Sequence, residues 1–254
     1  MQVTFLGTGT SMGIPMIGCQ CKVCQSKDPR DKRTRTSVWL KINGINIIID
    51  TGIDFRQQAL RENISTVDAV LFTHHHVDHI FGLDELRAIN FLQKKPVAIY
   101  SSDHTYQHLK RVYKYVFDNS CYPSDTPEID HQLIDEDPFQ VFNIEIIPVP
   151  LFHGELPVFG FRIGNFSYCT DVSRIPPESY ELLQGSDVVV LGALRDRPHP
   201  THFTIEQAVE EAQKIGAKKT YLVHLSHEVG HQELIARLPK SIQPAFDGLR
   251  INVD

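Results

Sequence analysis

Residues 71 to 82, LFTHHHVDHIFG, place four histidines and one aspartate within six consecutive positions, directly after a short apolar run. Alternate side chains of an extended segment share one side, so His74, His76, Asp78 and His79 can all turn toward one point. Imidazole nitrogens and a carboxylate oxygen suit divalent ions such as Zn²⁺, Mn²⁺ or Fe²⁺, whereas a strongly soft site would need thiolates. The segment therefore predicts a metal site.

The number of donors in this segment predicts two ions rather than one. Because Asp78 and His79 are adjacent, both cannot easily reach an ion bound by His74 and His76, and we expect a second ion roughly 3.5–4 Å from the first. Two ions need further ligands from elsewhere in the chain. The alternative is a surface patch of histidines, which the preceding apolar strand disfavours. His75 is expected to point away from the ions.

The elements that must position these residues follow one layout twice. Each half begins with hairpin strands and continues with strands that alternate with helices. The first half predicts strands at 37–42 and 45–50 joined by the turn Asn43-Gly44, then helix 54–63, strand 67–72, helix 81–92, strand 97–101 and helix 104–117. The second half predicts strands at 141–150, 157–163, 166–171, 187–193 and 220–225, and helices beginning near Pro176, Thr204 and His231.

This pattern predicts an α/β (α+β) fold in which two sheets pack face to face with helices outside, a four-layer αββα sandwich. Residues 121–138, rich in Pro, Asp and Ser, are expected to form an irregular connection over the site. The apolar content of that stretch is too low for a second core. We therefore expect residues 1–254 to form a single domain.

Composition restricts the classes of partner. The chain has 254 residues, 41% of them hydrophobic, and a formal net charge of −6. An acidic balance argues against binding long nucleic acid, which needs a broad basic face, but leaves a small anionic substrate open. A basic segment followed by an apolar one is absent from the N-terminus, and no long apolar run occurs elsewhere, so we expect a soluble cytoplasmic protein without membrane contact.

The segment THHHVDH matches the T-H-x-H-x-D-H signature of the metallo-β-lactamase superfamily, and IIIDTG at 47–52 resembles the strand that precedes it there. The resemblance implies an αββα sandwich with a dinuclear site. It implies a first ion on His74, His76 and His153 and a second on Asp78, His79 and His224, with Asp171 and a hydroxide bridging them. The resemblance also implies that Asp50 orients a ligand imidazole, although a turn-capping role competes.

A second candidate metal site is the C-x-C-x-x-C segment of Cys19, Cys21 and Cys24. Three thiolates on a tight loop suit a structural zinc ion, which takes a fourth ligand. The candidates for that ligand are Cys121, Cys169 and His227. His227 is favoured, because it lies three residues after His224, where a strand passes into a helix and one turn offers one imidazole to each site. Unmetallated thiols are the alternative.

The segments GTGTSMGIPMIGCQCKVC, RTRTSVWL and HPTHFTIEQA narrow the resemblance to the cyclic phosphodiesterases of the carbon-phosphorus lyase pathway, which open phosphoribosyl 1,2-cyclic phosphate. In that family the cysteines and a late histidine bind a structural zinc. The tRNA 3′-processing nucleases are similar, and their catalytic histidine falls here on His202. The chain departs from those nucleases because it has no long Gly- and Lys-rich insertion. A pyrroloquinoline-quinone accessory family shares the cysteine clip but lacks an intact H-x-H-x-D-H.

The resemblance implies hydrolysis of a small phosphorylated substrate, a cyclic sugar phosphodiester, with two Zn or Mn ions at the active site and one structural zinc. Two ions sharing a hydroxide would generate a nucleophile near neutral pH. His202 is the candidate acid that protonates the leaving oxygen, and His199 is the alternative. Arg33 and Arg35 are candidate phosphate contacts, against the more common solvated role. Acyl hydrolysis and non-catalytic metal binding are competing functions, and the resemblance alone suggests a homodimer.

Overall fold

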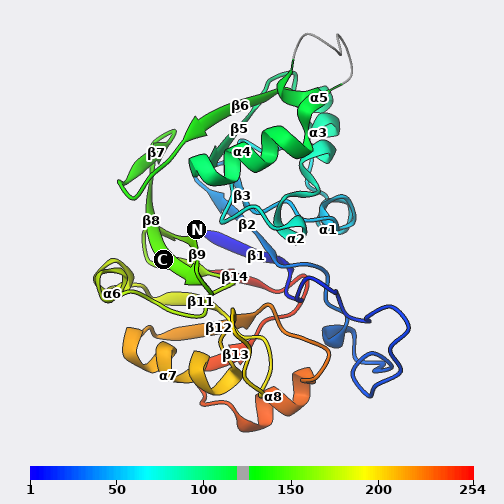
Figure 1. Cartoon of the computed structure of the whole chain (residues 1–254), viewed down its shortest axis with the longest axis vertical. Helices are drawn as coiled ribbons and strands as arrows, with labels where there is room; N and C mark the ends of the chain where they lie inside the picture. The colour runs from blue at the N-terminus through cyan, green and yellow to red at the C-terminus, as the bar shows by residue number, and fades with distance from the viewer. Residues whose placement is uncertain (119–125) are drawn as a thin grey trace.

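The computed structural model describes residues 1–118 and 126–254, which form two seven-stranded sheets packed face to face (Figure 1). The first sheet has the order β14-β1-β2-β3-β4-β5-β6. Its strands are β1 Gln2–Gly7, β2 Ser37–Ile42, β3 Ile45–Ile49, β4 Ala69–Leu71, β5 Val97–Ser101, β6 Ile129–Leu133 and β14 Arg250–Asn252. The chain thus ends beside the strand with which it began, and the Met1 amino group donates to the Val253 carbonyl at 2.9 Å.

The second sheet has the order β13-β12-β11-β10-β9-β8-β7. Its strands are β7 Phe139–Val141, β8 Ile144–His153, β9 Leu156–Ile163, β10 Phe166–Cys169, β11 Val188–Gly192, β12 Lys219–Val223 and β13 Ile242–Pro244. In both sheets antiparallel hairpin strands precede parallel ones: β3 to β6 pair in parallel, as do β10 to β13. The repeated layout predicted from the sequence is therefore confirmed.

Alternate side chains of the central strands pack on opposite faces of each sheet. In β3, Ile47 and Ile49 lie in the core between the sheets, whereas Ile48 packs against the helices outside. In β11, Val190 lies between the sheets and Val189 faces the outer helices. Because both faces of these strands are buried, their sequences are continuously apolar rather than alternating.

Helices cover the outer face of each sheet, which confirms the αββα sandwich. Phe55, Leu86 and Leu109 pack their helices on the first sheet, and Leu183, Ala208 and Leu234 pack theirs on the second. Figure 1 shows the two groups on opposite sides of the paired sheets. The helices are α1 Phe55–Glu62, α2 Val77–Ile80, α3 Leu86–Gln93, α4 Asp103–Val112, α5 Lys114–Phe117, α6 Pro177–Leu183, α7 Ile205–Ile215 and α8 His231–Arg237, with 3₁₀ turns at Pro29–Asp31 and Leu83–Glu85.

The structure differs from the sequence prediction in several elements, and the short strands β7, β13 and β14 were not predicted. Residues 129–133, expected to be irregular, form β6, whose mostly exposed side chains carry no apolar periodicity and which is defined by backbone pairing with β5. The expected helix 81–92 begins as a 3₁₀ turn and becomes α3 only at Leu86. The expected helix 104–117 divides into α4 and α5 at Tyr113, whose hydroxyl donates to the Ile80 carbonyl.

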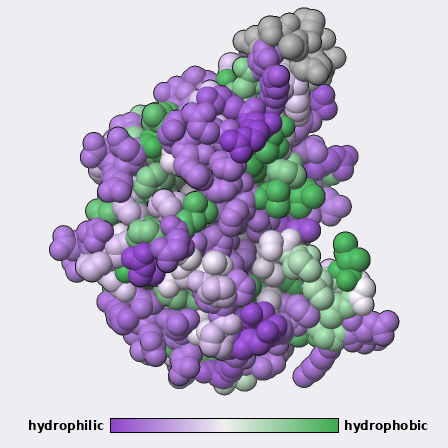
Figure 2. All heavy atoms as spheres, in the orientation of Figure 1, coloured by the Kyte–Doolittle hydropathy of each residue, from purple (hydrophilic) through white to green (hydrophobic). Residues whose placement is uncertain are grey.

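The face seen in Figure 2 is mainly hydrophilic, with hydrophobic residues in small separate groups. Within residues 1–118 and 126–254, no helix is both long and apolar enough to cross a membrane.

Candidate metal centre and active site

The candidate ligands lie where strands of both sheets end. His74, Asp78 and His79 follow β4 in the first sheet, whereas His153 ends β8 and Asp171 follows β10 in the second. The two edges are joined directly, because the Phe159 amide donates to the Thr73 carbonyl at 3.1 Å. Strands that run in one direction therefore deliver side chains distant in sequence to one place.

The side chains form two groups that share one aspartate. In each group the candidate ligand atoms lie within 4.8 Å of one another. The first group is His74, His76, His153 and Asp171, and the second is Asp78, His79, His224 and Asp171. The structure thus brings together all seven residues singled out in the sequence, in the two sets that the superfamily resemblance implies.

The imidazoles present the same nitrogen to the middle of this cluster. The Nε2 atoms of His79 and His224 lie 3.4 and 3.3 Å from the Asp171 carboxylate. The Nε2 atoms of His74 and His153 each lie 3.9 Å from it. Asp78 Oδ2 is 3.4 Å from His79 Nε2 and 3.5 Å from His224 Nε2. Asp171 is therefore placed between the two groups and within reach of both.

The donors suit bound cations, because several are buried without partners. The Nε2 atoms of His74, His79 and His224 are buried and accept or donate no hydrogen bond. Leaving buried polar atoms unpaired costs about 1–3 kcal/mol each, so a native protein is expected to satisfy them with a ligand. These unpartnered nitrogens, with carboxylate oxygens beside them, fit Zn²⁺ or Mn²⁺.

The pKa shifts of these groups fit a site that binds cations, with a neutral His74 imidazole beside the ionised Asp171 carboxylate. Burial lowers the pKa of His74 well below its ordinary value, which leaves the neutral imidazole that metal binding needs. Burial alone would also lower the pKa of His79, but three neighbouring carboxylates, with Asp171 the strongest, raise it well above its ordinary value. Burial alone would raise the pKa of Asp171, yet His224 and the other imidazoles hold it well below its usual range.

Asp50, at the end of β3, orients one imidazole in each group. Its Oδ2 atom lies 2.7 Å from His79 Nδ1 and accepts the Thr73 hydroxyl at 2.8 Å. The Thr73 oxygen in turn lies 2.9 Å from His74 Nδ1. Both imidazoles are thereby held with Nε2 free. The sequence suggested the contact of Asp50 with an imidazole but not the role of Thr73, whose only signal is its place before the first histidine.

Backbone strain accompanies the site. Asp50, Asp171 and His224 have φ values of 63°, 48° and 58°, in the left-handed region that residues other than glycine rarely adopt. All three follow the last residues of strands that converge on the cluster. Such conformations cost of order 1–3 kcal/mol each and persist where the surrounding fold dictates them. The strain is consistent with side chains aimed at a site rather than placed by turn preference alone.

Close backbone packing also fixes the second group. A Cβ atom on Gly52 would lie 2.0 Å from the carbonyl oxygen of Asp78. Only glycine therefore allows the segment after β3 to pass beneath α2. The IIIDTG motif therefore has two roles at the site: Asp50 orients an imidazole, and Gly52 leaves room for the Asp78 backbone.

His202 lies beside the cluster but in neither ligand group. Its ring is 4.5 Å from that of His153 and stacks on that of His224 at 4.7 Å. Burial, followed by the effect of His224, lowers the pKa of His202 to about 2. His199 lies 5.0 Å from His202, ring to ring, and burial lowers its pKa as well. Both candidate acids thus border the site, and His202 is the nearer to the ligands.

The segment of His202 is anchored on both sides. The Thr204 hydroxyl oxygen accepts the Gln207 amide, and the Gln207 side-chain oxygen accepts the Thr204 amide, a capping box that begins α7. On the other side, the Thr201 carbonyl lies 2.6 Å from His153 Nδ1, which leaves His153 Nε2 free for a metal. The same short segment therefore positions a ligand and the candidate acid.

The two candidate arginines have different surroundings. Arg33 is 1% exposed, and its guanidinium donates to the carbonyls of Ser226 and Val229 and pairs with Asp31 at 3.2 Å. Both predictions for Arg33, a solvated side chain and a phosphate contact, are therefore wrong. The buried Arg33 side chain connects the cysteine loop to the segment after β12. Arg35 pairs with Asp54 at 3.0 Å.

Arg35 nevertheless lies near the metal cluster. It lines a cavity of about 180 Å³ together with Asp78, Ser11, Ile53, Val77 and Phe81. Its Nε donates to the Ser11 carbonyl at 3.0 Å, so the head group is fixed at this edge. Of the two arginines, Arg35 alone is placed to meet a molecule that enters beside Asp78.

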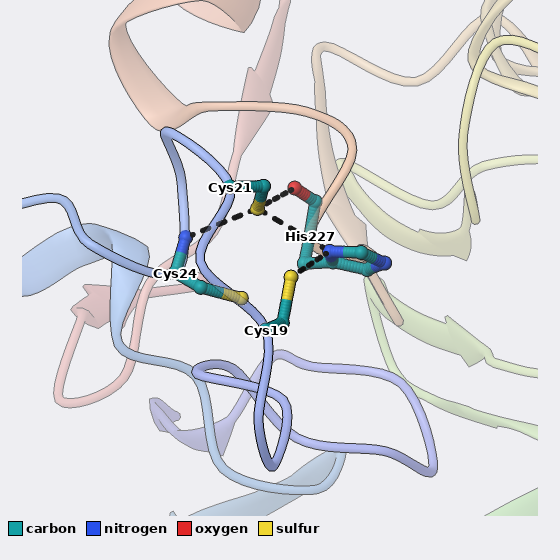
Figure 3. A group of neighbouring side chains, drawn as sticks. All are labelled: Cys19, Cys21, Cys24 and His227. Carbon is teal, nitrogen blue, oxygen red and sulfur yellow. Dashed lines mark hydrogen bonds between the residues drawn. The ribbon is translucent and has the colours of Figure 1, made fainter.

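The cysteine cluster converges with His227 (Figure 3). His227 Nδ1 lies 3.3 Å from Cys19 Sγ and 3.4 Å from Cys21 Sγ. Backbone amides donate to sulfur: Cys24 N to Cys21 Sγ, and Met16 N to Cys24 Sγ. The four ligand atoms lie within 4.8 Å of one another, as a tetrahedral zinc site requires.

Of the other candidates for the fourth ligand, Cys169 is buried in the core between the second sheet and its helices. Cys121 lies outside the residues that the structure describes. His227 is therefore the candidate that the structure places beside the three thiols.

The four-layer sandwich with this donor set defines a metal-dependent hydrolase. The chain belongs to the beta-lactamase superfamily, because the family model of the beta-lactamase superfamily domain matches residues 45–225. The crystal structure of a new diphosphatase from the PhnP family superposes with a TM-score of 0.93 at 43% identity, and the match covers 98% of this chain and 96% of that one.

Two sequence relatives are also similar. A ribonuclease Z of Acaryochloris marina is 25% identical over 290 residues, which cover 89% of this chain and 86% of the relative. An octanoyltransferase of Porphyromonas gingivalis is 41% identical over 258 residues. That match covers 100% of this chain but 52% of the octanoyltransferase, so the chain spans about half the length of that relative.

Proposed function

We propose that the protein hydrolyses a small phosphodiester, with a cyclic sugar phosphate as the first candidate substrate, using two divalent ions bound by the seven-residue cluster. The observation that carries this proposal is the shared carboxylate: Asp171 belongs to both ligand groups, while His202 lies at their edge and belongs to neither. Two Zn or Mn ions would lower the pKa of a shared water toward neutrality and neutralise phosphate charge.

The residues of the chain supply the remaining functions. His153, fixed through the Thr201 carbonyl, and His79, fixed through Asp50, orient the cluster. His202 would give a proton to the leaving sugar oxygen. A phosphate anion beside this imidazole favours its protonated form, which opposes the effect of burial on its pKa. His199 is the alternative donor. Arg35 would contact a second, non-reacting phosphate group from the edge near Asp78.

The phosphate class is supported by two comparisons that span most of the chain, those with the diphosphatase and with the ribonuclease Z. The diphosphatase activity of the first protein favours a second candidate substrate, a small compound with a phosphoric anhydride bond. Because the chain also matches part of an octanoyltransferase, the test includes an acyl substrate. The net charge of −6 disfavours long nucleic acid.

We further propose a structural zinc ion on Cys19, Cys21, Cys24 and His227. The support is the convergence of three thiols and an imidazole nitrogen, with amide donors to two of the sulfurs. Amide hydrogen bonds to sulfur favour the thiolate, which is the form that binds zinc.

The proposed function is tested by hydrolysis assays on one preparation whose metal content is measured by elemental analysis. The substrates are a ribose cyclic phosphodiester, bis(p-nitrophenyl) phosphate, a nucleoside diphosphate sugar, an octanoyl thioester, a lactam and a precursor tRNA. We expect turnover of the cyclic phosphodiester that a chelator abolishes. Preferential cleavage of the thioester or lactam by metal-loaded protein would contradict the proposal, and preferential cleavage of the tRNA would assign the nuclease alternative.

A further inference from the structure

Three imidazoles converge outside both ligand groups of the candidate active site. They belong to His75, His104 and His108, and their candidate ligand atoms lie within 4.8 Å of one another. The ring of His75 is 3.8 Å from that of His108 and 4.8 Å from that of His104, centroid to centroid. The rings of His104 and His108 are 5.0 Å apart.

One helix and one loop bring these side chains together. His104 and His108 are four residues apart on α4 and therefore share one face of the helix. The helix is fixed at its start by Ser102, whose hydroxyl accepts the Thr105 amide, and along its length by the buried Leu109. His75 belongs to the loop after β4 and, unlike His74 and His76, is absent from the group around Asp171.

One nitrogen of this cluster lacks a partner. His75 Nδ1 is buried and makes no hydrogen bond. A histidine that serves packing alone against the same helix looks different: His131 of β6 stacks on Tyr106 of α4 at 3.6 Å, and its Nε2 is paired with the Ser101 hydroxyl at 3.0 Å. The unpaired His75 nitrogen beside two further imidazoles is the arrangement that a cation would complete.

The residue types indicate which cation. All three donors are imidazole nitrogens, with no carboxylate and no thiolate in the group. Such a set favours Zn²⁺, Cu²⁺ or Ni²⁺ over Mg²⁺ or Ca²⁺, which prefer oxygen ligands. His104 is exposed whereas His75 and His108 are half-buried, so the open coordination position would face solvent.

We propose that His75, His104 and His108 bind one borderline divalent metal ion, taken here as zinc, at a third site distinct from the dinuclear cluster and from the cysteine site. An ion there would tie the loop of His74 and His76 to α4, because His75 lies between them in the chain. The site does not depend on the reaction that the dinuclear cluster performs.

The test compares the zinc bound by the full-length protein and by variants after equilibrium dialysis against micromolar zinc, by elemental analysis. The variants are His104→Ala, His108→Ala and the double substitution, and the control is Gln107→Ala on the same helix. Gln107 donates to Asp103 and belongs to no histidine cluster. His75 is left unchanged because its neighbours are candidate active-site ligands.

We expect the double variant to bind one zinc fewer per chain than the wild type and the control, with an unchanged circular dichroism spectrum. The single variants should bind the third zinc at least about 10-fold more weakly in a competition titration, since each loses a direct ligand. Equal zinc content in the double variant and the wild type would overturn the proposal. Absence of phosphodiester turnover in the wild type would count against the proposed function and leave the zinc count at this third site unaffected.

Discussion

The Nδ1 atom of His79 lies 2.7 Å from the Oδ2 atom of Asp50, a carboxylate that is completely buried at the end of β3. The same oxygen accepts the hydroxyl of Thr73, which is paired with His74. Asp50 therefore sets the orientation of one imidazole in each ligand group, although it belongs to neither group. This relationship predicts that metal affinity depends on a residue that does not touch the metal.

Replacing Asp50 with Asn should weaken metal binding at the cluster by about 10–100-fold, because the amide cannot accept both hydrogen bonds with the strength of a carboxylate. Competition with a chromophoric chelator measures the change. The control is Asp68→Asn, since Asp68 lies just before β4 and pairs with Lys95, away from the site. Equal affinity of the Asp50 variant and the wild type would show that the network does not orient the ligands.

Replacing His202 with Ala should lower turnover of the preferred phosphodiester by about 10²–10⁴-fold, the usual contribution of a general acid. The metal content should stay the same, because His202 is in neither ligand group. Parallel measurement of kcat and bound metal separates the two effects. His199→Ala is the comparison, and a larger loss in that variant would transfer the role to His199.

Replacing Gly52 with Ala should destabilise the protein by about 1–3 kcal/mol, because the added methyl group would overlap the Asp78 carbonyl. Relaxation would displace Asp78, so metal affinity should fall as well. Thermal unfolding and metal titration measure both effects. In the matched control Gly230→Ala, the nearest atom to the new Cβ is 3.8 Å away. Identical behaviour of the two variants would rule out this packing constraint.

Once zinc is removed, Cys21 should be alkylated more readily than Cys24 and Cys169. Amide donation from Cys24 lowers the pKa of Cys21 to about 6, whereas burial raises the pKa of Cys24 to about 11 and that of Cys169 to about 12. A lowered pKa means that the Cys21 thiolate persists at neutral pH and is lost only as the pH falls below about 6.

Mass spectrometry after brief iodoacetamide treatment of chelated protein checks this order of reactivity. Cys21 should be labelled at pH 7 well before Cys24 and Cys169, with a rate that falls between pH 7 and pH 5. Added zinc should protect Cys21 if the cysteine cluster binds it. Labelling of Cys24 ahead of Cys21 would contradict the predicted thiolate.

Much of the fold was predictable because the order of residues within short segments determines many of its strands, helices and turns. The turn at Asn43-Gly44, the apolar strands and the amphipathic helices each depend on residues close in sequence. The edge strand β6 was not predictable, because its exposed side chains have no pattern and its definition depends on pairing with β5. At the break between α4 and α5, the Tyr113 hydroxyl donates to a distant partner, the Ile80 carbonyl, which no local pattern predicts.

The sequence by itself determined that four potential metal ligands follow β4 and that three cysteines lie within one short loop, because ligand chemistry and spacing are local properties. Only the tertiary structure decided that Asp171 lies between the two groups of donors, that His227 rather than Cys169 lies beside the three thiols, that Arg33 is buried rather than free for substrate, and that His75 meets α4. These relationships join segments distant in sequence: strand ends of two sheets, two loops, or a loop and a helix. Their distances are set by sheet order and packing, which no spacing along the chain records.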